Sequence, residues 1–236
     1  MQIVQESSNL YRLTRFGIIN CFLVREEDSS TLIDTNVTGS SEPILLAQKN
    51  LGLPIRRILL THAHFDHVAS LDRLLEKLPE ADVSVGEREA RFLQGDFSLE
   101  PNERGKRLFG FLSVKTKVTR KLSDGQRVGS LRAIASPGHT PGHFSYLDIR
   151  DGTLIAGDAF TTQTGLVAAG VFSWVFPFPA LFSWNPELCA RSAAKLRDLK
   201  PDRLAVGHGK TLVSPGAAMD RATALAFQQH PDRSTH

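Results

Sequence analysis

The stretch THAHFDH (residues 61–67) lies where a predicted strand runs into a predicted helix. In an extended segment, residues two apart project to the same side, so His62 and His64 can present their imidazoles to one metal ion. Asp66 and His67 follow where the chain turns into the helix. Neutral imidazole nitrogens and carboxylate oxygens are ligands for borderline metals such as zinc. The stretch therefore predicts a metal-binding loop, and an apolar helical stripe follows it: Val68, Leu71, Leu74, Leu75 and Leu78.

Three further segments place a ligand-capable residue just past the end of a predicted strand. They are SPGHTPGH (136–143), AGD (156–158) and VGHG (206–209), after strands expected over residues 131–135, 153–156 and 203–206. The flanking glycines allow the backbone to turn sharply and to approach a metal closely. We therefore expect His139, Asp158 and His208 to converge on one place.

Strands alternate with helices along the chain and are mixed with hairpin-like stretches. Helices are expected to begin at Ser41, Asn185 and Ser214, where capping residues or prolines precede apolar runs. No linker rich in proline, glycine or serine divides the sequence. We therefore predict one α/β domain with mixed sheets over residues 1–236, with a frayed tail at 231–236.

Composition narrows the class of protein. The 236 residues are 41% hydrophobic with a net charge of +3, which is typical of a globular chain. The first residues lack a basic segment followed by an apolar one, so a cytoplasmic location is expected. Cys21 and Cys189 have no metal or redox spacing and are expected to be reduced packing residues. The motifs of serine hydrolases, P-loop proteins and dinucleotide-binding proteins are absent from the sequence.

Taken in order, THAHFDH, SPGHTPGH, AGDAF and VGHG resemble the metallo-β-lactamase superfamily. From LIDT (residues 32–35) to VGHG, the resemblance covers nearly the whole chain in the family's order and roughly its spacing. It implies a four-layer αββα sandwich, in which two mixed β-sheets are flanked by helices and a metal site lies at one edge of the sheets.

The resemblance also implies a ligand set. His62, His64 and His139 would hold a first metal; Asp66, His67 and His208 would hold a second, and Asp158 would bridge both. Two divalent ions are expected, with zinc first and iron or manganese as alternatives, because the same nitrogen and oxygen ligands serve each. Asp34 matches a position near the site and is expected to orient a ligand histidine. His143 either supports the ligands in the same way or is a packing or surface histidine.

This ligand set implies a dinuclear metal-dependent hydrolase. A hydroxide bridging the metals would attack the carbonyl carbon of a small-molecule ester, thioester, lactone or lactam. Asp158 would be catalytic as the bridge, and Asp66 by orienting water or passing a proton. The chain is similar to glyoxalase II-like and lactonase-like members. However, only 28 residues follow His208, too few for the C-terminal helices of glyoxalase II, and Thr161 stands where familiar lactonases have tyrosine.

Two alternatives stay open. Persulfide dioxygenases of the same superfamily are similar in their HxHxDH motif, later histidine and aspartate, but they use a single iron. A metal-binding protein without catalytic activity is the other alternative, and it is weaker because all seven ligand positions are filled.

Residues 165–184 carry no charge, and their aromatic residues are interleaved with Pro177 and Pro179. The prolines interrupt any helix, so a membrane span is not expected. This segment is expected either to form a lid or pocket wall for an apolar acyl group, or to lie in the core or in a homodimer interface. The residues expected in such a pocket are Phe160, Phe172, Trp174, Phe176 and Phe178.

Residues 104–121 form a basic stretch without an acid, which includes Lys106, Arg107, Lys115, Lys117 and Arg120. Only Phe109 and Phe111 interleave with these charges, whereas single-stranded nucleic acids are bound by aromatic stacking residues in a recognised module. We therefore expect a solvated basic face and no nucleic-acid partner.

Overall fold

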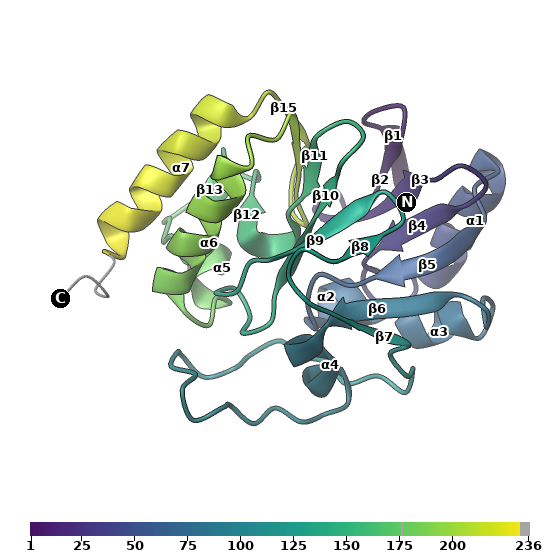
Figure 1. The fold of residues 1–236 in the computed structure, drawn as a ribbon, viewed down its shortest axis with the longest axis horizontal. Coiled ribbons are helices and arrows are strands. Elements are labelled where there is room, and N and C mark those ends of the chain that lie inside the picture. Colours follow the sequence, from purple (N-terminus) through teal and green to yellow (C-terminus); the bar gives the residue numbers. More distant parts are fainter. Residues whose placement is uncertain (176, 232–236) are drawn as a thin grey trace. The chain divides into compact units, whose positions relative to one another are not determined.

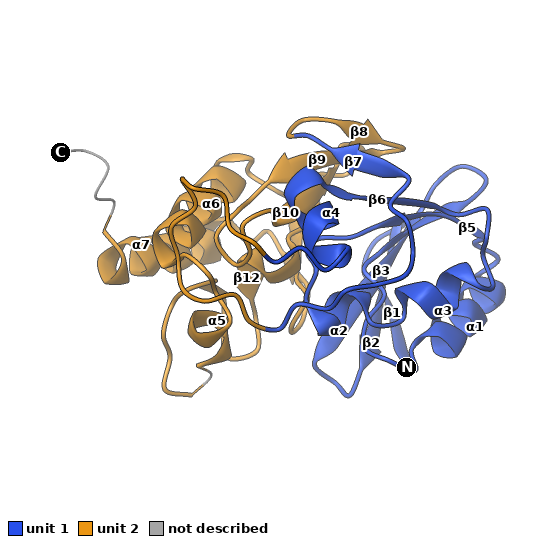
Figure 2. Ribbon diagram, turned by 90° about the horizontal axis from the view of Figure 1, so that it is seen from below, with its two compact units in different colours: residues 1–97, 110–123 blue, residues 98–109, 124–236 orange. Residues whose placement is uncertain are grey.

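A computed structural model describes residues 1–175 and 177–231. Its contacts divide the chain into two compact units, shown in different colours in Figure 2. Unit 1 comprises residues 1–97 and 110–123, and unit 2 comprises residues 98–109 and the chain from 124 onward. The predicted single domain stays a prediction. The predicted frayed tail lies outside the described residues from position 232 onward.

Unit 1 contains a seven-stranded mixed sheet whose strands follow one another in sequence order. The first four strands pair antiparallel, and β4 to β7 pair parallel. Strands β3 and β4 are buried along almost all of their length, as expected for strands that are covered on both sides. The strands are β1 (Gln2–Gln5), β2 (Leu10–Arg15), β3 (Ile19–Arg25), β4 (Ser30–Ile33), β5 (Ile55–Leu59), β6 (Asp82–Gly86) and β7 (Arg120–Leu122).

The helices of unit 1 are α1 (Ser41–Leu51), α2 (Phe65–Val68), α3 (Leu71–Leu75) and α4 (Glu87–Leu93). The sequence predicted one helix after the THAHFDH stretch, but the structure has two short ones, α2 and α3. Ser70 lies between them, where its hydroxyl donates to the carbonyl of Val37 at 2.6 Å and accepts the amide of Ser40 at 3.0 Å. These bonds to a distant loop hold Ser70 where the two helices are separated.

Unit 2 contains a six-stranded sheet in the order β15-β14-β11-β10-β9-β8. Only β11 and β14 pair parallel in it, and the other described pairs are antiparallel. A separate two-stranded sheet joins β12 to β13. The strands are β8 (Arg127–Val128), β9 (Leu131–Ala135), β10 (Phe144–Asp148), β11 (Thr153–Ile155), β12 (Phe160–Thr161), β13 (Val167–Ala168), β14 (Arg203–Ala205) and β15 (Leu212–Val213).

The helical elements of unit 2 are the 3-10 turn η1 (Gly157–Ala159), α5 (Phe178–Leu181), α6 (Pro186–Asp198) and α7 (Gly216–Gln229). Figure 1 shows α6 and α7 side by side, and the two helices are in contact. The side chain of Asn185 accepts the amide of Leu188 at 3.0 Å and caps α6, as its sequence predicts. The apolar faces of these helices bury a core with the sheet that includes Leu154, Leu204 and Met219.

Cys21 and Cys189 are both free and buried. Burial raises the pKa of the Cys189 thiol to about 12 and raises the pKa of Cys21 far above its usual range. Thiolates are therefore scarce at neutral pH, which agrees with a packing role. Among the described helices, none combines the length and the apolar character needed to cross a bilayer.

Candidate functional site

In unit 1, the THAHFDH loop and Asp34 meet because β4 and β5 are parallel neighbours. The carboxyl ends of parallel strands lie at the same edge of a sheet. Asp34 follows β4 and its amide donates to the carbonyl of Leu59, the last residue of β5, at 2.9 Å. The sheet topology therefore places Asp34 beside the loop that begins at Thr61.

The carboxylate of Asp34 collects three hydrogen bonds from this loop. It accepts the Thr61 amide at 2.8 Å, the Thr61 hydroxyl at 2.8 Å and Nδ1 of His67 at 2.8 Å. Asp34 is buried, and its backbone is left-handed with φ of 59°. Aspartate tolerates this conformation better than most residues, but it still stores strain. The surrounding bonds hold the strained residue with its carboxylate against the loop.

These bonds determine which ring nitrogens of His62 and His67 carry a proton. A carboxylate only accepts, so Nδ1 of His67 must donate to Asp34. The single proton of the Thr61 hydroxyl goes to Asp34, so this oxygen accepts from Nδ1 of His62 at 2.9 Å. In a neutral ring the Nε2 atom then carries the lone pair. One buried carboxylate therefore orients both rings so that their Nε2 lone pairs could donate to a metal ion.

The predicted ligands of unit 1 lie together. The ring centroid of His62 is 4.6 Å from that of His64 and 4.1 Å from that of His67, and all three rings are buried. A carboxylate oxygen of Asp66 lies 3.8 Å from Nε2 of His67. Asp66 is part of α2 and does not precede it, since His64 holds the N-cap position.

Glu89 is a residue that the sequence did not single out. It lies on α4, has no exposed surface, and its carboxylate accepts the amide of Ala63 at 2.8 Å. This bond fixes the backbone between His62 and His64. Because α4 follows β6, Glu89 reaches the loop through sheet order, and no spacing within the motif could have revealed it.

In unit 2, the predicted ligands also follow neighbouring strands. Asp158 follows β11 and His208 follows β14, and these two strands are parallel. The amide of Gly207 donates to the carbonyl of Gly157 at 2.8 Å, which aligns the two strand exits. A carboxylate oxygen of Asp158 then lies 3.1 Å from Nε2 of His208 and 3.5 Å from Nε2 of His139. Asp158 therefore stands between two histidines in this unit.

His139 is oriented by Ser183, which the sequence did not single out. The Ser183 hydroxyl donates to the carbonyl of Pro179, so its oxygen accepts from Nδ1 of His139 at 3.3 Å. The lone pair of His139 is thus on Nε2, which faces Asp158. Gly138 permits this placement, because a side chain there would collide with the backbone of Cys189.

His143 is fully buried and supports Asp158 through the backbone. Its Nε2 accepts the Asp158 amide at 3.1 Å, so Nδ1 carries the proton and donates to the Ser136 hydroxyl at 2.9 Å. The Ser136 hydroxyl then donates to the Ser145 hydroxyl at 2.8 Å, and the Ser145 hydroxyl donates to the carbonyl of Ala156 at 3.3 Å. Since its Nε2 lone pair faces this amide, His143 is placed to hold Asp158.

The predicted pocket residues separate into two groups. Phe160 is buried within the hydrophobic core of unit 2, whereas Phe172, Trp174 and Phe178 are exposed. Phe176 lies outside the described residues. The uncharged segment is therefore surface at Phe172, Trp174 and Phe178, and Phe160, which precedes it, is core.

The basic stretch 104–121 is divided between the units, with residues 104–109 in unit 2 and 110–121 in unit 1. Lys106, Arg107, Lys115, Lys117 and Arg120 are all exposed, in agreement with a solvated face.

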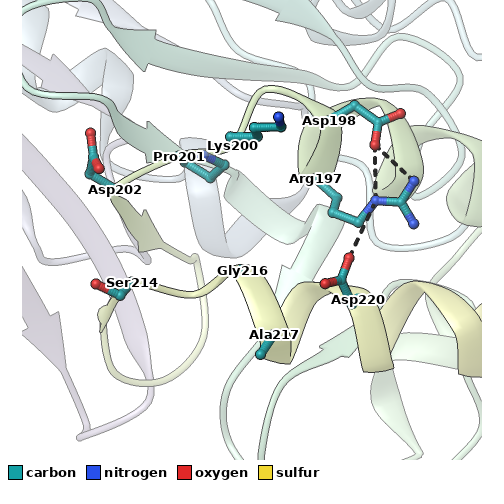
Figure 3. Close-up of a pocket in the computed structure, with 9 residues that line it drawn as sticks. All are labelled: Arg197, Asp198, Lys200, Pro201, Asp202, Ser214, Gly216, Ala217 and Asp220. Atoms are coloured by element: carbon teal, nitrogen blue, oxygen red, sulfur yellow. Dashed lines mark hydrogen bonds and ion pairs between the residues drawn. The ribbon is translucent and has the colours of Figure 1, made fainter.

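Unit 2 also has an open groove of about 450 Å³ between the end of α6 and the start of α7 (Figure 3). Arg197 pairs there with Asp198 at 2.8 Å and lies 3.7 Å from Asp220. The groove carries both signs of charge, contains none of the predicted ligands, and is lined by Arg197, Asp198, Lys200, Pro201, Asp202, Ser214, Gly216, Ala217 and Asp220.

Comparison with known proteins tests the family. Residues 14–208 match the family model described as the metallo-beta-lactamase superfamily. The chain belongs to this superfamily. It is 47% identical to the uncharacterized protein YobT of Bacillus subtilis, over 96% of this chain and 99% of that protein. It is 30% identical to “Probable metallo-hydrolase YflN” of the same organism, over 81% of each.

More distant matches extend the comparison. A hydroxyacylglutathione hydrolase of Legionella pneumophila is 29% identical over 66% of this chain and 54% of that protein. Among solved structures, a beta-lactamase from Chitinophaga pinensis is 25% identical with a TM-score of 0.67, covering 97% of this chain and 92% of that one. TTHA1623, solved in a di-iron-bound form, is 25% identical with a TM-score of 0.64, covering 87% and 94%.

These findings confirm the predicted family and fold class. Mixed sheets flanked by helices in both units agree with the metallo-β-lactamase fold. Members of this superfamily bind metal ions, and both units contain histidine and aspartate side chains suited to hold one. The metallo-hydrolase relatives support a hydrolase.

Proposed function

We propose that this chain is a dinuclear metal-dependent hydrolase, in which the ligand sets of the two units together hold two divalent ions. The first ion would take His62, His64 and His139. The second would take Asp66, His67 and His208, and Asp158 would bridge the two. The observation that carries the proposal is the preparation of Nε2 lone pairs on His62, His67 and His139 by hydrogen bonds at Nδ1.

The donor chemistry fits such ions. Five imidazoles and two carboxylates are typical ligands of zinc, and the same set serves iron or manganese. We expect zinc first. Iron is the next choice, since TTHA1623 was solved in a di-iron-bound form.

When bound, such ions supply Lewis acidity for a carbonyl oxygen and lower the pKa of a coordinated water towards neutrality. The protein's own part is to hold the ligands and to manage protons. The Asp158 amide donates to Nε2 of His143, and the hydrogen bond from the Gly207 amide to the Gly157 carbonyl aligns Asp158 with His208. Asp66 is partly exposed, so its carboxylate can orient a water molecule or accept its proton.

We infer that the substrate is a small molecule with an ester, thioester, lactone or lactam carbonyl. The hydroxyacylglutathione hydrolase relative favours a thioester as the first substrate to try. An apolar acyl group is supported by the uncharged segment 165–184, which contains Ser183, the partner of His139.

The proposal is tested by measuring bound metal together with turnover of an ester, thioester, lactone and lactam panel. We expect about two metals per chain, and in Asp158→Ala a loss of bound metal and a rate at least about a hundredfold lower. Asp220→Ala is the matched control, because Asp220 is an exposed aspartate on α7 of the same unit. One iron per chain with oxygen consumption on a persulfide would replace the proposal with a dioxygenase. Bound metal without turnover of any panel member would favour a non-catalytic protein.

A further inference from the structure

Unit 2 exposes several large apolar side chains in and around residues 165–184. Trp174 is 91% exposed and Val175 is 79% exposed, although apolar residues of this size usually contribute to a core. Contiguous exposed apolar surface in a soluble protein marks a place of interaction. We define the aromatic patch by its exposed members: Phe109, Phe172, Trp174, Val175, Phe178 and Leu181.

Contacts within unit 2 hold this patch together. The amide of Gly170 donates to the carbonyl of Pro179 at 3.0 Å, which closes the segment into a loop. The ring of Phe172 lies 5.0 Å from that of Trp174. The ring of Phe182 lies 6.2 Å from Phe178 and 5.2 Å from Phe109, so it joins the loop to residues 98–109.

A basic rim adjoins the patch, formed by the exposed residues Arg104, Lys106 and Arg107. The ammonium group of Lys106 donates to the carbonyl of Ala180 at 3.0 Å, and its amide donates to the carbonyl of Trp184 at 2.7 Å. A side chain at Gly105 would collide with the indole of Trp184, so the two segments are in close contact. Figure 2 shows both segments within unit 2.

The charges around the patch are of one sign where it is most apolar. No acid occurs in residues 165–184. Glu100 and Glu103 precede the rim, and the Glu103 carboxylate accepts the Glu100 amide at 2.8 Å. The rim therefore presents positive charge directly beside the exposed rings.

We infer that the aromatic patch and its basic rim dock this protein onto an anionic lipid bilayer. Tryptophan and phenylalanine favour the boundary between headgroups and acyl chains, and lysine and arginine favour anionic phosphates. A second copy of this chain is a less favourable partner for the patch. A two-fold interface through the patch would bring the two basic rims together, and their like charges would repel. Docking is independent of the chemistry proposed for the metal ligands.

The experiment uses the two tryptophans of the chain. Trp184 is buried and Trp174 is exposed, so a change of environment at the patch alters the emission of Trp174. Full-length metal-loaded protein is mixed with vesicles of phosphatidylcholine alone, or of phosphatidylcholine and phosphatidylglycerol at roughly two to one. We expect sedimentation with the anionic vesicles and a shift of the emission to shorter wavelength, both weakened by high salt. Trp174→Phe should lose the shift and keep most of the binding.

Charge reversal separates the rim from general electrostatics. Arg104→Glu combined with Arg107→Glu should weaken vesicle binding at least about tenfold. Lys77→Glu combined with Lys117→Glu makes the same charge change at exposed positions of unit 1 and should retain binding much closer to that of wild type. Equal losses in the two pairs would overturn the proposal, as would no binding to anionic vesicles. A dimer that Trp174→Glu dissociates, without vesicle binding, would assign the patch to a second copy.

Discussion

The carboxylate of Asp34 lies 2.8 Å from Nδ1 of His67, although the two residues are 33 positions apart in the sequence. The same carboxylate binds the amide and hydroxyl of Thr61, which in turn faces His62. One buried group thus orients two predicted metal ligands. Such supporting bonds typically change metal affinity by about 10- to 100-fold when removed.

Asp34→Asn should lower metal affinity by about 10- to 100-fold, because an amide is a weaker acceptor for Nδ1 of His67 and for the Thr61 hydroxyl than a carboxylate. Asparagine tolerates the left-handed backbone at this position, so the variant changes charge without adding strain. Competition with a chelator measures the affinity. Asp82→Asn, at an exposed position of β6 in the same unit, is the control. Unchanged affinity in Asp34→Asn would contradict the orienting role.

Thr61→Val should also weaken metal binding, because it removes the hydroxyl that links Asp34 to His62 while keeping the shape of the side chain. Thr61→Ser keeps the hydroxyl and should stay close to wild type. Since the two residues share one network, the losses in Asp34→Asn and Thr61→Val should not add in the double variant. Additive losses would show that the two residues act independently.

His143→Leu should destabilise the protein by roughly 1–3 kcal/mol, because the partly buried Asp158 amide loses its acceptor. It should also reduce metal retention, since Asp158 is then held less firmly. His143→Gln can supply an acceptor oxygen and should recover part of both. Urea unfolding and metal analysis measure these effects. His230→Leu, which loses a partly buried bond to the Gly170 carbonyl, is the comparison. If His143→Leu lowers the free energy of unfolding by no more than His230→Leu does, the role of His143 in supporting Asp158 is wrong.

Asp72 should contribute stability that disappears in acid. Burial opposes its ionisation, but bonds from the Lys115 amide and from the Thr116 amide and hydroxyl outweigh burial and lower its pKa. A lowered folded pKa stabilises the protein above the unfolded value of about 3.9, and this contribution is lost as pH falls through the folded value. Asp72→Asn should therefore be less stable than wild type at neutral pH and approach it in acid.

The pH dependence is followed by urea unfolding across the acidic range. The effect is expected to be small, because Asp72 is largely solvated. If Asp72→Asn stays less stable than wild type by the same amount in acid, the hydrogen bonds to Asp72 stabilise the protein through packing and not through its ionisation.

Local patterns in the sequence predicted much of the fold. The predicted strand at 131–135 matches β9, and Asn185 caps α6 as its side chain and the following proline indicate. These features depend on residues within a few positions, where backbone propensity and capping act. The histidine and aspartate motifs and the family they indicate were predictable for the same reason, since each motif is short and contiguous.

Tertiary structure decided which side chains support the predicted ligands. Glu89 and Ser183 come from segments far from the THAHFDH and SPGHTPGH stretches, and no spacing announces them. It also decided which aromatic residues are buried. Phe160 lies in the core and Trp174 is exposed, although no charged residue separates them in the sequence. Chemical identity and local propensity are properties of a short stretch of chain. Burial and hydrogen-bond partners depend on which distant strands become neighbours, and only the folded sheets determine that.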